Sequence, residues 1–144
     1  MVALVKDKRG AILVQAILFL PILILIVVGS FEVWKAISVK QSLHSGTYQA
    51  TRYLSLNPVL SLNSEDWVEE AEKFVEPELK NNGFVSAGTA KKVSITVDTP
   101  DSLDCGKTFT IKTELSWKAV IPYLSRSDWK LVDQHEGFIV CEEL

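Results

Sequence analysis

An almost uninterrupted apolar stretch near the N-terminus constrains this chain more than any other feature. Between Ala11 and Val28 only Gln15 is not apolar, and the stretch reaches 21 residues when it is carried through Phe31. That length matches the ~20 residues that span a bilayer core and exceeds the ~7–15 apolar residues of an ordinary secretory signal. No A-x-A cleavage pattern follows it. The sequence therefore predicts a transmembrane helix over residues 11–31 that persists in the mature protein.

The charges that precede this stretch predict its orientation. Lys6, Lys8 and Arg9 lie before it, and positively charged flanks stay on the cytoplasmic side of a membrane. We therefore expect a single-pass protein of the cytoplasmic (inner) membrane, in contact with lipid, whose C-terminal part is extracytoplasmic. Residues 11–144 are acidic overall and contain no basic cluster larger than Lys91-Lys92, so nucleic-acid binding is not expected.

The residues around the start of the stretch form a recognisable motif. In order along the chain they are Arg9-Gly10-Ala11, Val14-Gln15-Ala16, Leu20-Pro21, Gly29 and Glu32. This motif resembles the N-terminus of TadE-like minor pilins and pseudopilins of the tight-adherence (Tad, Flp-type) pilus system. That family typically reads R-G-x-x-x-V-E-F-A, followed by apolar residues with a proline, then a glycine and an acidic residue.

The resemblance implies a processing step and a structural role. In such signals a prepilin peptidase cuts after the glycine, so residues 1–10 would be a cytoplasmic leader, removed between Gly10 and Ala11. Pro21 would bend the helix. The protein would be a component or initiator of a surface pilus involved in adhesion, not an enzyme. Its partners would be the prepilin peptidase, other minor pilins, the major Flp-type pilin and an inner-membrane assembly platform.

Gln15 departs from the family pattern, which usually has glutamate as the fifth residue after the cut. In pilins that carboxylate is thought to pair with the N-terminal ammonium of a neighbouring subunit, and a buried charge is tolerated mainly when it is paired. An amide accepts a hydrogen bond but does not neutralise the ammonium. We therefore expect Gln15 to make a weaker inter-subunit contact, which favours a minor or initiating subunit over a major pilin.

Two other functions remain open at this stage. A type II secretion or competence pseudopilin usually starts with a G-F-T-L-I-E-type sequence, which Ala11-Ile12-Leu13-Val14-Gln15 matches poorly. A signal-anchored extracytoplasmic binding module, which keeps residues 1–10, would show the same apolar helix and basic flank.

Helical periodicity continues beyond the apolar stretch. Polar residues now alternate with apolar ones, which predicts an amphipathic continuation over residues 32–56 that ends at Asn57-Pro58. A helix from 11 to 56 would be about 70 Å long. Trp34 lies where an interfacial aromatic anchor is expected, or it packs on the head. The apolar positions counted toward this pattern are Phe31, Trp34, Ile37, Leu43, Tyr48, Ala50, Tyr53 and Leu54.

The remaining residues, 57–144, predict a small extracytoplasmic head. A second helix begins at Asn63 or Ser64 and ends at Asn81-Asn82-Gly83; Pro77 is expected to kink or shorten it. Its acidic face is expected to be solvated, although it could dock a basic partner. Period-two patterns predict strands at 91–98, 108–121, 129–132 and 137–141, in an antiparallel meander that packs on the amphipathic helix. The fold class is α+β.

The two cysteines of the chain, Cys105 and Cys141, both lie in the predicted extracytoplasmic head. An even pair in an oxidising compartment predicts a disulfide. A pair of free thiols is the alternative.

The sequence carries no motif for catalysis, a metal or another cofactor. Its two histidines, His44 and His135, are far apart and outside any H-x-x-x-H or C-x-x-C frame, so no zinc site is expected. Ser125, Ser127 and Asp128 could join His135 in a triad on paper, but no nucleophile-elbow motif supports one. Calcium at the carboxylates of the loop before Cys105 is conceivable, yet their spacing is more typical of a solvated turn; these are Asp98, Asp101 and Asp104.

Overall fold

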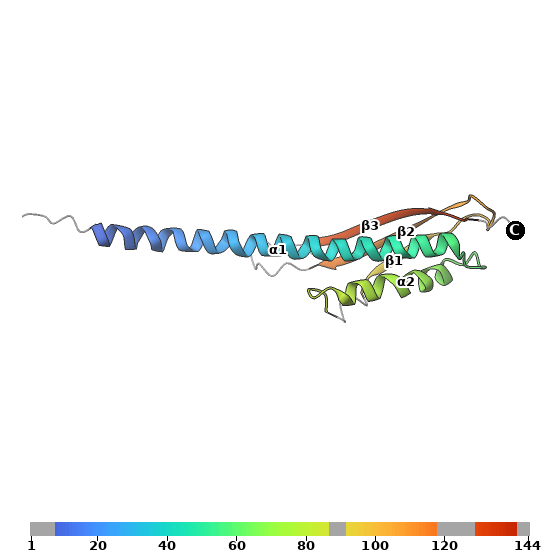
Figure 1. The fold of residues 1–144 in the computed structure, drawn as a ribbon, viewed down its shortest axis with the longest axis horizontal. Helices are drawn as coiled ribbons and strands as arrows, with labels where there is room; N and C mark the ends of the chain where they lie inside the picture. The colour runs from blue at the N-terminus through green and yellow to red at the C-terminus, as the bar shows by residue number, and fades with distance from the viewer. Residues whose placement is uncertain (1–7, 87–91, 118–128, 141–144) are drawn as a thin grey trace, which may run out of the picture. The chain divides into compact units, whose positions relative to one another are not determined.

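The computed structural model describes residues 8–86, 92–117 and 129–140. Contacts divide the chain into two units, Met1–Trp34 and Lys35–Leu144. Helix α1, Lys8–Leu56, contributes its first part to one unit and its second part to the other. The second unit also contains α2 and three strands, labelled in Figure 1. The predicted α+β class is confirmed.

Helix α1 covers the whole of the predicted range 11–56. Pro21 lies inside the helix and does not end it. Proline has no N–H, so one carbonyl of the preceding turn lacks its donor, and a helix tolerates this loss where other groups bond that carbonyl. The helix ends at Leu56, after which the backbone N–H of Asn57 donates to the carbonyl of Tyr53 at 2.8 Å. Pro58 cannot donate a further bond of this kind, so the end of the helix follows from the sequence.

Helix α2, Ser64–Asn81, is capped at both ends as its sequence predicts. The side chain of Asn63 accepts from the backbone N–H of Glu65, and the backbone N–H of Asn82 donates to the carbonyl of Leu79. The helix continues past Pro77 to Asn81, so the expected shortening at this proline is wrong. Proline removes one backbone hydrogen bond from the helix, and the packing of the buried face of α2 outweighs that loss.

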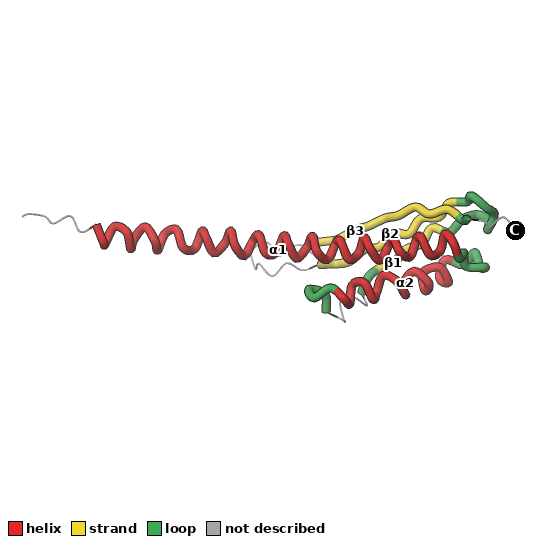
Figure 2. Tube along the Cα trace, in the orientation of Figure 1, coloured by secondary structure: helices red, strands yellow, loops and turns green. Residues whose placement is uncertain are grey.

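The three strands form one antiparallel sheet in the order β1-β2-β3 (Figure 2). Strand β1 is Ser94–Asp98 and β2 is Thr108–Trp117. Strand β3 is Trp129–Phe138, and it pairs with β2 over the full length of both. The predicted meander is therefore confirmed; the end of the predicted second strand and the turn at 125–128 lie outside the described residues.

The expected division of the last segment into strands at 129–132 and 137–141 is wrong. The intervening residues 133–136 are polar, and their polarity suggested a loop. In the structure they continue β3 because each pairs with a residue of β2 between Thr110 and Thr113. Backbone pairing thus extends the strand through a segment whose side chains break the apolar alternation.

Both helices of the second unit cover the same face of the sheet. Directly paired residues share a face, and this rule puts Ile111, Val97 and His135 on one side. On that side the side chain of Thr47 in α1 meets Thr113 in β2 at 2.8 Å between their hydroxyl oxygens, and the rings of Trp67 in α2 and Phe109 in β2 lie 5.1 Å apart. The buried apolar residues of this core are Val39, Leu43, Ala50, Leu54, Trp67, Ala71, Val75, Leu79, Val85, Val97, Phe109, Ile111, Leu115 and Ile139.

The buried face of α1 differs in part from the expected one. Leu43, Ala50 and Leu54 are buried as predicted, but Ile37, Tyr48 and Tyr53 are between 40 % and 52 % exposed. Small and hydroxyl residues take part in the buried face instead. They do so because the helix is approached from two sides, by the sheet and by α2, which leaves little room for large side chains; these residues are Gly46, Thr47 and Thr51.

Candidate functional site: the apolar helix and a histidine cluster

The first part of α1 has no buried face in this chain. The large apolar side chains between Ile12 and Val28 are 43–70 % exposed, and they surround the helix on all sides. Among the described residues α1 is the one helix long and apolar enough to cross a membrane, and its most apolar window is entirely unburied. Water does not accommodate such a surface, so lipid or other apolar helices must cover it. One long apolar helix near the N-terminus fits a single-pass membrane protein.

The residues expected to act in processing and assembly lie on this helix. Gly10 and Ala11 are in its first turns, with side chains outside the described set. Gln15 follows one turn later and is exposed, with apolar residues on both sides of it along the chain. The processing and contact roles of these three residues, and the bend at Pro21, stay predictions.

An aromatic pair closes the apolar segment. The rings of Phe31 and Trp34 lie 5.7 Å apart, and Trp34 is 54 % exposed. A tryptophan at the end of an apolar helix is typical of a membrane–water interface, where its ring is amphipathic and its N–H reaches water.

The predicted disulfide involves two segments that the backbone brings together. The N–H of Gly106 donates to the carbonyl of Ile139, and the N–H of Ile139 donates to the carbonyl of Lys107, both at 2.9 Å. The residue after Cys105 is therefore bonded to a residue two positions before Cys141. Cys141 lies outside the described residues, so the pairing stays a prediction.

Three polar side chains converge where α1 faces β3. His44 Nδ1 lies 3.2 Å from Asp133 Oδ2, His135 Nε2 lies 3.2 Å from the same oxygen, and the two ring nitrogens lie 3.0 Å apart. Asp133 and His135 are two residues apart on β3, so both point to the same face of the sheet. His44 reaches them from α1, and the two imidazole rings lie 4.6 Å apart.

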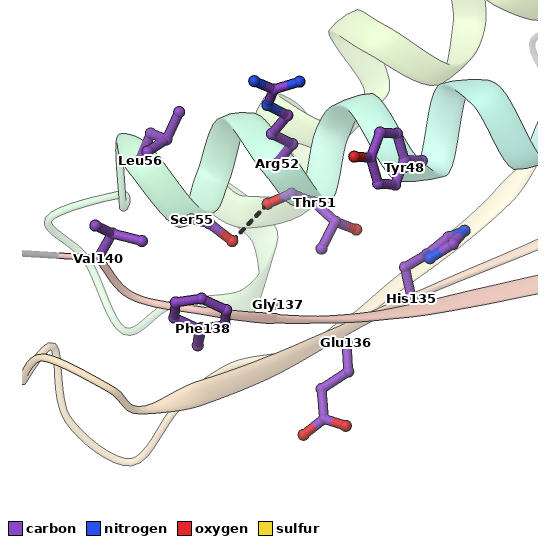
Figure 3. Close-up of a pocket in the computed structure, with 10 residues that line it drawn as sticks. All are labelled: Tyr48, Thr51, Arg52, Ser55, Leu56, His135, Glu136, Gly137, Phe138 and Val140. Carbon is purple, nitrogen blue, oxygen red and sulfur yellow. Dashed lines mark hydrogen bonds between the residues drawn. The ribbon is translucent and has the colours of Figure 1, made fainter.

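A groove continues from this cluster along α1 and β3. Figure 3 shows His135 pointing from β3 toward α1, with Tyr48 opposite it and Glu136 directed to the other side of the strand. The rings of Tyr48 and His135 meet edge to face at 5.8 Å. The groove has a volume of about 350 Å³ and ends among apolar side chains at Leu56, Phe138 and Val140.

The sequence did not indicate this cluster. The two histidines are 91 residues apart. His135 falls between the strands expected at 129–132 and 137–141, so the direction of its side chain could not be inferred. The spacing Asp133-x-His135 places both side chains on one face only if the segment is a strand, and the sequence did not predict a strand there. Of the other candidates, Asp98, Asp101 and Asp104 do not form a group with metal-binding geometry in the described part of the chain, and Ser125, Ser127 and Asp128 lie outside it.

An apolar helix that continues into the amphipathic helix of a small α+β head is similar to the plan that the resemblance to pilins implies. A comparison with protein families agrees, because residues 10–52 match the model of the TadE-like protein family. This match confirms the resemblance of the N-terminal segment to the TadE-like proteins of Tad pilus systems. No curated protein and no solved structure matches the chain.

Proposed function

We propose that this protein is a minor pilin or pseudopilin that forms part of a Tad/Flp-type pilus or initiates its assembly, after a prepilin peptidase has cut between Gly10 and Ala11. The observation that carries the proposal is the exposed apolar segment of α1, which starts at Ile12 and lies within the family match over residues 10–52. A membrane holds such a helix before assembly, and neighbouring pilin helices cover it afterwards. Other pilus components are the partners that this class implies.

Gln15 supports a minor rather than a major role. The new ammonium at Ala11 would lie about one helical turn from the side chain at position 15 of the same or a neighbouring helix. A glutamine offers that ammonium one neutral acceptor and no compensating charge. A filament built from many copies of this chain would bury many unpaired ammonium groups, which is costly. A few copies, set among partners that carry glutamate, avoid that cost.

The chain's own work is then packing rather than catalysis, as expected of a structural family. The head presents surfaces that include an acidic face on α2, where Glu70 and Glu76 form ion pairs with Lys73 and Lys80. The side chain of Gln49 donates to Glu78 at 2.8 Å. Pairing within the head supports a solvated face more than a dock for a basic partner.

Intact-mass spectrometry of the membrane-extracted protein tests the proposal. Cells with an active prepilin peptidase should yield a chain that starts at Ala11, and cells with an inactivated peptidase should yield one that keeps residues 1–10. Gly10→Leu should block processing in the first strain, because the peptidase requires a small residue before the cut, whereas Gly29→Leu, also on α1 but with no atom within 4 Å of an added Cβ, should be processed normally.

Retention of residues 1–10 beside an active peptidase would overturn the proposal. The protein would then be a signal-anchored extracytoplasmic module. Removal of the leader without co-purification of any Tad component would favour a pseudopilin of another secretion system.

A further inference from the structure

The triangle of His44, Asp133 and His135 has the dimensions of a metal-binding site. Its three donor atoms are separated by 3.0–3.2 Å. Two ligands bound to zinc at ~2.0–2.1 Å in tetrahedral geometry lie about 3.3 Å from each other. The three donors are therefore already nearly at the separations that one zinc ion would impose, and only small side-chain rotations would seat it.

Hydrogen bonds within the triangle do not account for this geometry. Each of its three edges would need its own proton, but with Asp133 ionised only the two ring nitrogens can carry one. If His135 donates to the Nδ1 lone pair of His44, then that Nδ1 has no proton for Asp133, and two lone pairs face each other at 3.2 Å. If both nitrogens carry protons, two N–H groups face each other at 3.0 Å. With Asp133 ionised, one edge is therefore left without a hydrogen bond, whereas a central cation would contact all three donor atoms favourably.

The positions of the ligands suit a site that is held firmly but stays open on one side. The side chains of Asp133 and His135 are 12 % and 23 % exposed, and that of His44 is 58 % exposed. Strand β3 is fixed by its pairing with β2, in which Asp133 is opposite Thr113. The open side leaves a fourth position for water, as in zinc sites with three protein ligands.

We propose that His44, Asp133 and His135 bind one Zn²⁺ ion, which links helix α1 to strand β3 of the head. Two imidazoles and one carboxylate form a ligand set that suits zinc and related transition metals, whereas Ca²⁺ and Mg²⁺ prefer oxygen ligands only. The carboxylate also offsets part of the charge of the ion.

Such an ion would stabilise the contact through which the head is attached to the pilin helix. His44 and Asp133 are 89 residues apart, so the bound ion would close a long loop of the chain, much as a disulfide does. Since the ion binds only the folded arrangement, its binding free energy adds to the stability of the head.

Isothermal titration of the full chain in detergent micelles with Zn²⁺ alone tests this proposal. The protein must carry no histidine tag and must be kept oxidised, so that neither a tag nor thiols compete for the ion. We expect one Zn²⁺ per chain, and a rise in Tm on the order of 5 °C or more at saturating Zn²⁺. Ca²⁺ and Mg²⁺ at the same concentration should leave the Tm unchanged.

Variants assign the ligands. His44→Ala removes an exposed side chain and should fold, yet it should weaken Zn²⁺ binding by at least about 10-fold, the loss typical of even indirect contacts. Asp133→Asn should do the same. Asp98→Asn is the matched control, because Asp98 is an exposed carboxylate at the end of β1, the strand at the other edge of the sheet. This variant should bind Zn²⁺ as the unchanged chain does.

Two outcomes would overturn the site. One is a chain that binds no Zn²⁺ at 100-fold excess over protein. The other is binding that persists unchanged in His44→Ala and Asp133→Asn, which would place the ion elsewhere. Neither outcome changes the expected processing after Gly10, so the experiments test the zinc site and the proposed function independently.

Discussion

At the scale of single residues, a close approach between the two helices depends on a glycine. A Cβ built on Gly46 would lie 2.9 Å from the Cα of Val75 and 3.4 Å from the carbonyl oxygen of Phe74. These are backbone atoms of α2, which cannot move aside as the end of a flexible side chain would. Glycine therefore sets the distance between α1 and α2. At Gly137 in β3 an added Cβ would instead meet side chains, since it would lie 2.5 Å from Phe109 Cζ and 2.8 Å from Thr51 Cγ2.

We expect Gly46→Ala to destabilise the head. Alanine is better than glycine inside a helix by about 0.8–1.0 kcal/mol, but overpacking against a backbone typically costs ~1–3 kcal/mol. Because the clash is with backbone atoms, the cost should lie in the upper part of that range, which leaves a net loss of about 1–2 kcal/mol. It would be read as a lower Tm in thermal denaturation followed by circular dichroism. Gly83→Ala is the control, since its Cβ would meet nothing within 4 Å. An unchanged Tm for Gly46→Ala would mean that the helices separate more readily than the packing suggests.

Glu114 gives a pH-dependent contribution of known sign. The hydrogen bond and charge of Lys112, 2.7 Å away, lower the pKa of Glu114, and Lys130 adds a smaller effect. A carboxylate with a lowered pKa stabilises the folded state at neutral pH, and this contribution is lost as the pH falls through the folded-state pKa. Because both side chains are partly exposed to solvent, which screens their interaction, the contribution is small.

Lys112→Gln should raise the pKa of Glu114 toward its ordinary value, which an NMR titration of the carboxyl group would detect. Lys130→Gln should raise it less, because its ammonium is 3.9 Å from the carboxylate. A larger shift for Lys130→Gln than for Lys112→Gln would contradict the assigned cause.

At the scale of secondary-structure elements, the end of β3 is fastened twice to its surroundings. The bonds between Ile139 and residues 106–107 tie it to the start of β2, and the N–H of Val140 donates to the carbonyl of Ser55 in α1 at 2.9 Å. The predicted disulfide would fasten the same corner covalently. Strand, helix end and loop therefore depend on each other there.

Reduction of the predicted Cys105–Cys141 bond should destabilise the head by roughly 3–4 kcal/mol, from the chain entropy of a loop of about 37 residues. Denaturant unfolding of the oxidised chain, of the reduced chain and of Cys105→Ser with Cys141→Ser measures this loss. The double variant should match the reduced chain and should not respond to reductant. Thiol alkylation of the untreated, unfolded chain would instead reveal free thiols and remove the disulfide.

At the scale of the whole molecule, the apolar part of α1 and the head impose different requirements. The head buries its core within this chain, whereas the segment that starts at Ile12 leaves its apolar side chains exposed. The chain alone therefore cannot remove this apolar surface from water. Membrane insertion and assembly with other pilin-like helices are two ways to meet the same requirement.

Gln15→Glu should strengthen self-association of the processed chain, because a carboxylate neutralises the ammonium at Ala11 of a neighbour. Cross-linking in micelles should show more dimers and higher oligomers for Gln15→Glu than for the unchanged chain or for Gln15→Leu. The unprocessed chain, which has no ammonium at Ala11, should gain nothing from the substitution. An equal gain in processed and unprocessed chains would show that the effect is not this charge pair.

The sequence by itself determined the features that depend on neighbouring residues. A single apolar run is enough to require lipid or other helices as its surroundings, and Asn63, Asn57 and Pro58 are enough to place helix ends, since caps and prolines act over one turn. The family resemblance was readable for the same reason, because its motif lies within one contiguous segment that starts at Arg9.

Only the tertiary structure decided the features that depend on distant residues. The polar segment 133–136 is part of β3 because β2 pairs with it, and no local pattern reveals that partner. His44 and His135 meet because a helix and a strand of fixed register pack on each other. Gly46 is close to Val75 for the same reason. Burial and register are properties of the assembled sheet and helices, so the cluster that we propose binds zinc could not be inferred from the order of residues alone.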